Sequence, residues 1–110
     1  MANTFKVKTK AGVTSLATVY TVPGSTTTVV VGLIVGNTTA SAITSTVTLS
    51  SDTSDTETNA DVEVITNAAI PGNSSLEIMA GNKIVMQTTD YIRVYGSGAV
   101  DICLSIMEIT

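Results

Sequence analysis

The side chains that carry most enzyme chemistry are scarce in this sequence. It contains no histidine, no tryptophan and one cysteine, Cys103. Without histidine, a serine or threonine lacks its commonest general base, and one cysteine can close neither an internal disulfide nor a paired-cysteine metal site. Cys103 lies between Ile102 and Leu104, so we expect a buried thiol that packs as a small hydrophobic side chain. The sequence therefore predicts no enzyme activity and no cofactor.

Carboxylates are the remaining candidates for chemistry. Asp90, Asp101 and Glu108 each lie near the start or end of an apolar run, where we expect solvated side chains. A pair of carboxylates that works as acid and base stays open, because residues that meet only in space cannot be paired from a sequence. These three residues give no catalytic assignment.

An acidic segment, residues 51–60, separates two apolar runs. With Asp61 it reads SDTSDTETNAD, and Asp52, Asp55, Glu57 and Asp61 could supply oxygen ligands to calcium. A calcium loop of the helix–loop–helix kind needs a central glycine and alternating ligands, which this segment lacks. We expect an exposed, solvated loop, with calcium binding as the alternative.

Three of the five basic residues alternate at the N-terminal end. Lys6, Lys8 and Lys10 fall on one face of a strand, since side chains there alternate. Alternate lysines protect the edge of a sheet from pairing with another sheet, and they could also dock on an acidic neighbouring subunit. Both interpretations stay open. Three lysines without stacking aromatics, in a chain of net charge −4, do not predict nucleic-acid binding.

The chain carries no charged residue from Ala11 to Ser51, and much of that stretch is threonine, serine and valine. Soluble monomers usually place charge on exposed strand faces, which keeps the sheets apart. Short uncharged side chains lose little conformational entropy when a partner buries them. The neutral stretch therefore predicts a subunit of an oligomer or larger assembly.

Alternating apolar and hydroxyl residues predict an all-β protein, because branching at Cβ favours pleated surfaces over helices. Turn residues divide the chain at intervals of about ten residues, which is typical of a β-sandwich or jelly roll. We expect a basic arm or strand at residues 1–10 and a single antiparallel β-sandwich at residues 11–110, of eight or nine strands in all. The expected strands are residues 4–9, 13–22, 27–37, 42–50, 61–66, 75–79, 83–87, 90–95 and 99–109. The apolar run at 27–37 predicts a strand buried on both sides.

Aromatic residues are few, and two of them share a strand. Tyr91 and Tyr95 lie four residues apart and hence on one face. They could pack beneath a turn or anchor a neighbouring molecule. Together with the three lysines, they are the candidate partner-binding residues. Carbohydrate binding is an alternative function, although four aromatic side chains make a poor sugar platform.

Three stretches carry a resemblance to a known family: YTVPGSTTTVVVGLIVGN, IPGNSSLEIMAGNKIVMQTTDYIRVYGS and the C-terminal VDICLSIMEI. They are similar to the small β-sandwich virion structural proteins of tailed bacteriophages, particularly those of marine phages. The resemblance spans most of residues 19–110 and consists of turn and strand residues. It implies a particle component without catalytic residues, most simply a capsid cement or decoration protein, with a neck, tail or fibre-attachment adaptor as the alternative.

The resemblance also implies partners and a location. We expect the chain to bind the major capsid protein or other virion proteins and to form a homo-oligomer, with a trimer favoured. The segment MANTFKVKTK has no apolar core of signal-peptide length, and the run VVVGLIVG is too short to cross a bilayer. We therefore expect synthesis in the host cytoplasm, no membrane contact, and a final location on the capsid surface.

Overall fold

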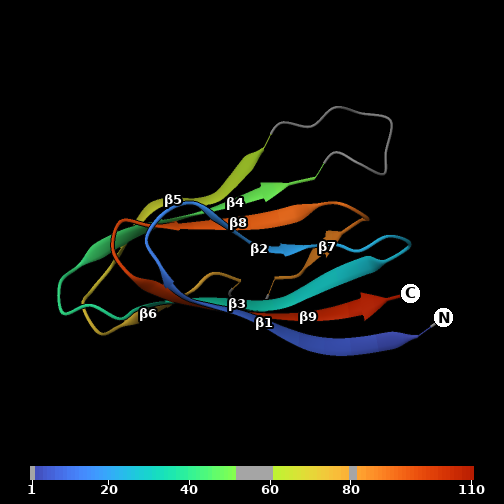
Figure 1. Ribbon diagram of the computed structural model, residues 1–110, viewed down its shortest axis with the longest axis horizontal. Helices are drawn as coiled ribbons and strands as arrows, with labels where there is room; N and C mark the ends of the chain where they lie inside the picture. The colour runs from blue at the N-terminus through green and yellow to red at the C-terminus, as the bar shows by residue number, and fades with distance from the viewer. Residues whose placement is uncertain (1, 52–60, 80–81) are drawn as a thin grey trace.

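In the computed structural model, which describes residues 2–51, 61–79 and 82–110, all regular structure is β-strand. Nine strands form two antiparallel sheets that face each other as two layers (Figure 1). Both termini lie at the same end of the molecule. The described residues include no helix that could span a membrane. The predicted fold class, an all-β antiparallel sandwich of eight or nine strands, is confirmed.

The first layer, sheet A, has the strand order β1-β9-β3-β6, and β7 also pairs with β3. Its strands are β1 (Asn3–Val13), β3 (Thr27–Asn37), β6 (Ser75–Glu77), β7 (Ile84–Met86) and β9 (Val100–Ile109). The short strands β6 and β7 pair with opposite ends of β3, so one edge of the sheet is broken into two pieces. The other edge is the eleven-residue strand β1.

The second layer, sheet B, has the order β2-β8-β4-β5. Its strands are β2 (Ala17–Thr21), β4 (Ile43–Ser50), β5 (Val62–Ile70) and β8 (Tyr91–Gly96). The expected strand at residues 13–22 is split: Val13 ends β1, and β2 starts at Ala17 in the other sheet. The basic strand expected at residues 1–10 is β1, which continues to Val13 through a bulge after Lys10.

The core lies between the sheets and follows the expected alternation. In β4, Ser45 and Val47 are buried, and Thr44, Thr46 and Thr48, which alternate with them, are half-buried on the other face. The large side chains that fill the core are Val30, Leu33, Val35, Ile102, Leu104 and Ile106 from sheet A, and Tyr20, Val47, Ile70, Ile92 and Val94 from sheet B. Each large apolar side chain buried in this way stabilises the fold by about 1.5–3 kcal/mol.

Two corners with the same sequence pattern turn the chain. Pro23-Gly24-Ser25 precedes β3, and Pro71-Gly72-Asn73 precedes β6. In each corner the third residue has a left-handed backbone, with φ of 54° at Ser25 and 57° at Asn73. Asparagine and serine tolerate this conformation better than bulky residues do. The two corners are therefore similar turns in different surroundings.

Candidate functional site

The three lysines of β1 share one face of the strand, and that face is directed toward the second sheet. Lys6, Lys8 and Lys10 pair with Ile106, Leu104 and Ile102 of β9, whose side chains are buried in the core. Side chains directly opposite each other lie on the same side of a sheet. The lysines thus line the rim of the core at the edge of the sandwich, not its outer surface.

Lys6 is part of a polar network at the end of the sandwich where the termini meet. Its Nζ lies 2.7 Å from Oε1 of Glu108, a residue of β9 that is 5% exposed. The Tyr20 hydroxyl lies 2.5 Å from Glu108 Oε2, to which it donates a hydrogen bond, and 2.8 Å from the Thr28 hydroxyl. Each oxygen of the buried carboxylate therefore has a partner.

The network shifts the proton affinities of its members. The hydrogen bond from Lys6, followed by the one from Tyr20, holds the pKa of Glu108 below its ordinary value of 4.5. Burial is the largest cause that raises the pKa of Tyr20 to about 12, and its hydrogen bond to Glu108 is the next. Glu108 is therefore ionised and Tyr20 protonated at neutral pH, and the network acts as a structural clamp.

The expectation of solvated carboxylates is wrong for two of the three residues. Glu108 and Asp90 are both buried, whereas Asp101 is exposed. Asp90 Oδ2 accepts a hydrogen bond from the Gln87 amide at 2.9 Å and closes the turn before β8. Asp101 Oδ1 accepts one from the Gly12 amide, also at 2.9 Å. Each of these carboxylates therefore has a partner of its own: the Gln87 amide for Asp90, the Gly12 amide for Asp101, and Lys6 with Tyr20 for Glu108.

The outer surface of sheet A is apolar. We call this surface the apolar face; its side chains come from four strands and are Phe5, Val7, Val29, Val31, Ile34, Val85, Met107 and Ile109. The most exposed are Phe5 at 75%, Val85 at 59%, Val7 at 58%, Ile34 at 43% and Val31 at 40%. Single exposed apolar residues are ordinary, but a contiguous patch of this kind marks an interaction surface.

The prediction that β3 is buried on both sides is wrong. Its inner side chains are fully buried, but Val31 and Ile34 are exposed on the outer side. A bulge between Val30 and Gly32 shifts the alternation by one residue, so that Leu33 is again directed inward. The apolar run reflects a core on one side and the apolar face on the other.

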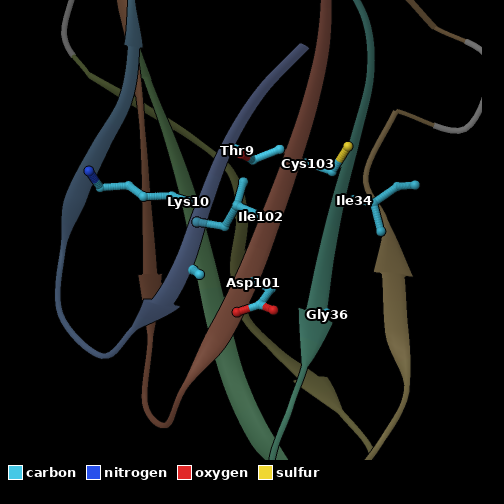
Figure 2. A pocket seen from close by; sticks show the side chains of 8 residues that line it. Thr9, Lys10, Ile34, Gly36, Asp101, Ile102 and Cys103 are labelled. Carbon is cyan, nitrogen blue, oxygen red and sulfur yellow. The ribbon is translucent and has the colours of Figure 1, made fainter.

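A groove interrupts the apolar face near the Val13 end of β1. It has a volume of about 400 Å³ and is lined by Thr9, Lys10, Ala11, Ile34, Gly36, Asp101, Ile102 and Cys103. Gly36 contributes no side chain there, and a Cβ added to it would meet only the Asp101 carbonyl at 3.8 Å. Figure 2 shows Cys103 and Ile34 on adjacent strands, with the Lys10 side chain extending away from them. Small residues between larger ones create the hollow.

Cys103 departs from its expected burial. Its side chain is half-buried and belongs to the outer side of β9, between Thr9 of β1 and Ile34 of β3. Ile102 and Leu104 on either side of it are directed into the core. The thiol is therefore a wall of the groove rather than part of the core.

The two candidate tyrosines lie on the outer side of sheet B, on its inner strand β8. Tyr91 and Tyr95 are half-buried and flank Arg93, whose guanidinium lies 4.7 Å from the centre of the Tyr91 ring. Thr46 and Thr48 of β4 stand opposite Tyr95 and Arg93. We call this surface the tyrosine face. Rigid aromatic rings beside an arginine are typical of the central residues of protein interfaces.

The structure does not bring the five candidate residues together. The lysines line an edge of sheet A, and the tyrosines lie on the far side of sheet B. Residues 52–60 of the acidic segment, including Asp52, Asp55 and Glu57, lie outside the described residues, and Asp61 is exposed. In the rest of the chain, no group of three His, Cys, Asp or Glu side chains could hold a metal ion.

The residues that sequence reasoning missed are those of the apolar face and the Tyr20–Glu108 pair. A signal for the first was present, because Phe5 and Val7 alternate with lysines on a strand and must share a face. The Tyr20–Glu108 pair gave no such signal, because the two residues are 88 positions apart in sequence.

No protein-family model matches the chain, and no curated protein matches it. Among solved structures, it is similar to a chain from Bacillus endospore appendages, described as a novel family of disulfide-linked pili. The two are 14% identical over 96% of this chain and 85% of that chain, with a TM-score of 0.46.

Proposed function

We propose that this chain is a non-enzymatic structural subunit that acts through its outer surfaces as part of a larger particle. The observation that carries the proposal is the apolar face on a sandwich whose core is already filled. Five large side chains that are 40% or more exposed on one sheet lie outside the core of the monomer. Burying them against a partner removes apolar surface from water and favours association.

The particle we propose is that of a tailed bacteriophage, and the support comes from the sequence resemblance to small virion proteins. In this proposal the chain is a capsid cement protein that binds the major capsid protein. A subunit that bridges neighbouring capsid proteins stabilises the shell because it binds the assembled state and not the separated one. A neck or tail adaptor is the alternative within the same class.

The tyrosine face is the surface we assign to the virion partner. Tyr91 and Tyr95 offer large, rigid contact areas, and Arg93 supplies a cation held over the Tyr91 ring. The threonines around them carry no charge that a partner would have to neutralise. Such a surface can bury polar side chains with a small loss of entropy.

Mass spectrometry of purified particles tests the proposal. We expect the chain in hundreds of copies per particle if it is a cement protein, and about a dozen if it is an adaptor. Absence from particles, with no binding of the purified protein to any virion component, would contradict both roles.

Co-sedimentation with capsids that lack the chain tests the assigned surface. The double variant Tyr91→Ala/Tyr95→Ala should weaken binding by at least about 30-fold, because anchors at the centre of an interface contribute most of its affinity. The control is Val62→Ala on β5, the edge strand of the same sheet, which also shortens an exposed side chain and should leave binding unchanged. Equal binding by all three proteins would exclude the tyrosine face.

A further inference from the structure

We propose that two copies of this chain pack face to face through their apolar faces, with Phe5 of each copy seated in the groove of the other. The inference rests on the proposed role as an assembly subunit and states which surface joins copies to one another. It leaves the tyrosine face of each copy free for a different partner. Shape, charge and register support it.

The register of sheet A places the outer side chains in four rows across the strands. From β1 toward β7 and β6, the rows are Asn3, Ile109 and Thr27; Phe5, Met107, Val29 and Val85; Val7, Ser105 and Gly32; and Thr9, Cys103, Ile34 and Glu77. The second row is apolar across its whole width and starts with the protruding ring of Phe5. The groove begins at the fourth row and continues to Asp101 and Gly36. The face therefore has a projection near one end and a hollow near the other.

A projection and a hollow on one flat surface can complement each other across a two-fold axis. Met107, opposite Phe5, and the groove residues Cys103 and Asp101 lie four to six positions apart on β9, about 14–20 Å along the strand. An axis across the strands at the level of Val7 would exchange the two positions and place each Phe5 over the partner's groove. Such a two-fold contact is isologous, so every contact between a residue of one copy and a residue of the other occurs twice.

The position of the groove also determines how the two sheets would cross. The groove is centred near β9, about one strand spacing of ~4.8 Å away from the Phe5 strand. The line from Phe5 to the groove then leans about 16° from the strand direction, and the two-fold operation doubles this to about 30°. Face-to-face sheets in β-sandwiches cross at about this angle.

The charges on the apolar face favour the same face of a second copy as the partner. The second and third rows carry no charged side chain; Glu77 lies at the margin, and Lys10 and Asp101, of opposite charge, are among the groove residues. Lys6 and Lys8 of β1 are on the opposite side of the strand. Two such faces meet without like-charge repulsion across these two rows, and a charged partner would find nothing there to pair with.

Pairing of β1 with β1 of another copy is the competing contact, and the lysines oppose it. In an antiparallel pair centred on Val7, Lys6 of one copy would stand opposite Lys8 of the other. Like charges directly opposite each other destabilise a sheet. The strand thus disfavours edge-to-edge association and leaves the face as the self-complementary surface.

The size of the face suits the centre of a dimer interface. Four strands and four rows project to about 14 Å by 20 Å, roughly 300 Å². A standard interface buries about 800 Å² of accessible surface per partner, with an apolar core inside a polar rim. Thr9, Thr27 and Asn3 at the margin can supply part of that rim. Because each copy covers the face of the other, assembly through this surface stops at two and does not give the trimer that the resemblance favours.

Sedimentation equilibrium of the purified protein over a wide concentration range tests the inference. We expect a monomer–dimer equilibrium that Val7→Asp weakens by about 100-fold or more, since a charge would be buried without a partner. Val62→Asp is the matched control, because Val62 is 57% exposed and Val7 58%, and both lie on edge strands. It should leave the equilibrium unchanged. A monomer or a trimer as the principal species of the wild-type protein, or a dimer insensitive to Val7→Asp, would overturn the proposal.

Crosslinking tests the position of Phe5. In the Phe5→Cys variant, mild oxidation should join the new thiol to Cys103 of the other copy and give a disulfide-linked dimer. Val62→Cys should give no such product, and melting curves confirm that both variants are folded. No crosslink in a dimeric Phe5→Cys protein would show that another surface pairs. Failure of either experiment leaves the proposed virion role intact, because particle binding and copy number are measured separately.

Discussion

At the scale of single residues, the two charged side chains of the network at the end of the sandwich differ in burial. The Glu108 side chain is 7% exposed and that of Lys6 is 43% exposed. An ammonium group that loses its partner can turn to water, whereas the carboxylate cannot. Removing the cation should therefore harm the fold more than neutralising the acid.

We expect Lys6→Ala to lower the free energy of unfolding by about 2–3 kcal/mol at pH 7, because it leaves Glu108 ionised and buried without its cation. Glu108→Gln should have a smaller effect. Urea unfolding measures both. Lys8→Ala is the control, since Lys8 lies on the same face of β1 but forms no ion pair in the described residues. A larger loss for Glu108→Gln than for Lys6→Ala would refute the assignment.

The same network predicts how stability depends on acid. The pKa of Glu108 in the folded protein lies below its ordinary value of 4.5, so the unfolded chain binds the proton more tightly. The stabilisation from the ionised carboxylate is complete above about pH 4.5 and disappears as the pH falls through the folded value. Unfolding curves between pH 3 and 7 should show this loss in the wild-type protein, and a smaller loss in Glu108→Gln. Parallel pH profiles would assign the acid sensitivity to other carboxylates.

At the scale of elements, the two Pro-Gly corners are similar turns, but only the corner at Gly72 packs closely against another segment of the chain. A Cβ on Gly72 would lie 2.3 Å from the Ala40 carbonyl oxygen, whereas one on Gly24 would meet nothing within 4 Å. The loop around Ala40 is held by Asn37, whose side-chain amide donates to the carbonyls of Ser41, Ile70 and Pro71. The backbone near Gly72 is thus closely packed.

Gly72→Ala should lower the free energy of unfolding by about 1–3 kcal/mol, because the backbone of one segment must move. Gly24→Ala is the matched control. It should be neutral or stabilise slightly, since it restricts the unfolded chain without a clash. Thermal unfolding of both variants compares them, and similar melting temperatures would contradict the close approach at Gly72.

The edge strand β1 leaves one side of its backbone open to pairing with another sheet. Ala2 and Thr110 exchange backbone hydrogen bonds at 3.1 and 2.9 Å. Because bonded and non-bonded pairs alternate in an antiparallel ladder, the amides of Asn3, Phe5 and Val7 point to the open edge. No strand among the described residues pairs with that side of β1. Such an edge needs protection from other sheets.

We expect Lys8→Thr/Lys10→Thr to make the protein aggregate into thioflavin-positive material, because the repulsion that protects the edge is lost. Lys8→Arg/Lys10→Arg keeps the charge and should stay soluble. Light scattering and thioflavin fluorescence follow the process. If the threonine variant stays soluble but loses affinity for capsids, the lysines serve docking on an acidic neighbour instead.

Much of the strand pattern was predictable, because alternation depends on neighbouring residues alone. The faces of β4 and the paired corners follow directly from sequence. Pairing across the sheet does not, since the register of β1 on β9 decides that Lys6 meets Glu108, 102 positions away. The bulge at Val31 also escaped prediction, because a continuous apolar run has no alternation to reveal its outer side.

At the scale of the whole molecule, the sandwich has two outer surfaces of different chemistry. Sheet A presents apolar side chains and a groove, and sheet B presents tyrosine, arginine and threonine. They lie on opposite sides of one core, so a residue changed on one surface touches none on the other. If the apolar face joins copies and the tyrosine face binds the particle, the two interactions should respond to mutation independently.

If dimerisation and capsid binding are independent, two variants should each lose only one of them. Tyr91→Ala/Tyr95→Ala should dimerise normally and lose affinity for capsids. Val7→Asp should lose dimerisation and bind capsids with about the affinity of the wild-type protein, because the two tyrosine faces of a face-to-face dimer point away from each other and cannot both meet one capsid surface. Sedimentation equilibrium and capsid co-sedimentation of the same preparations separate these effects. If Val7→Asp instead binds capsids more weakly than the wild-type protein, the two interactions are coupled. If it abolishes capsid binding altogether, the capsid itself covers the apolar face.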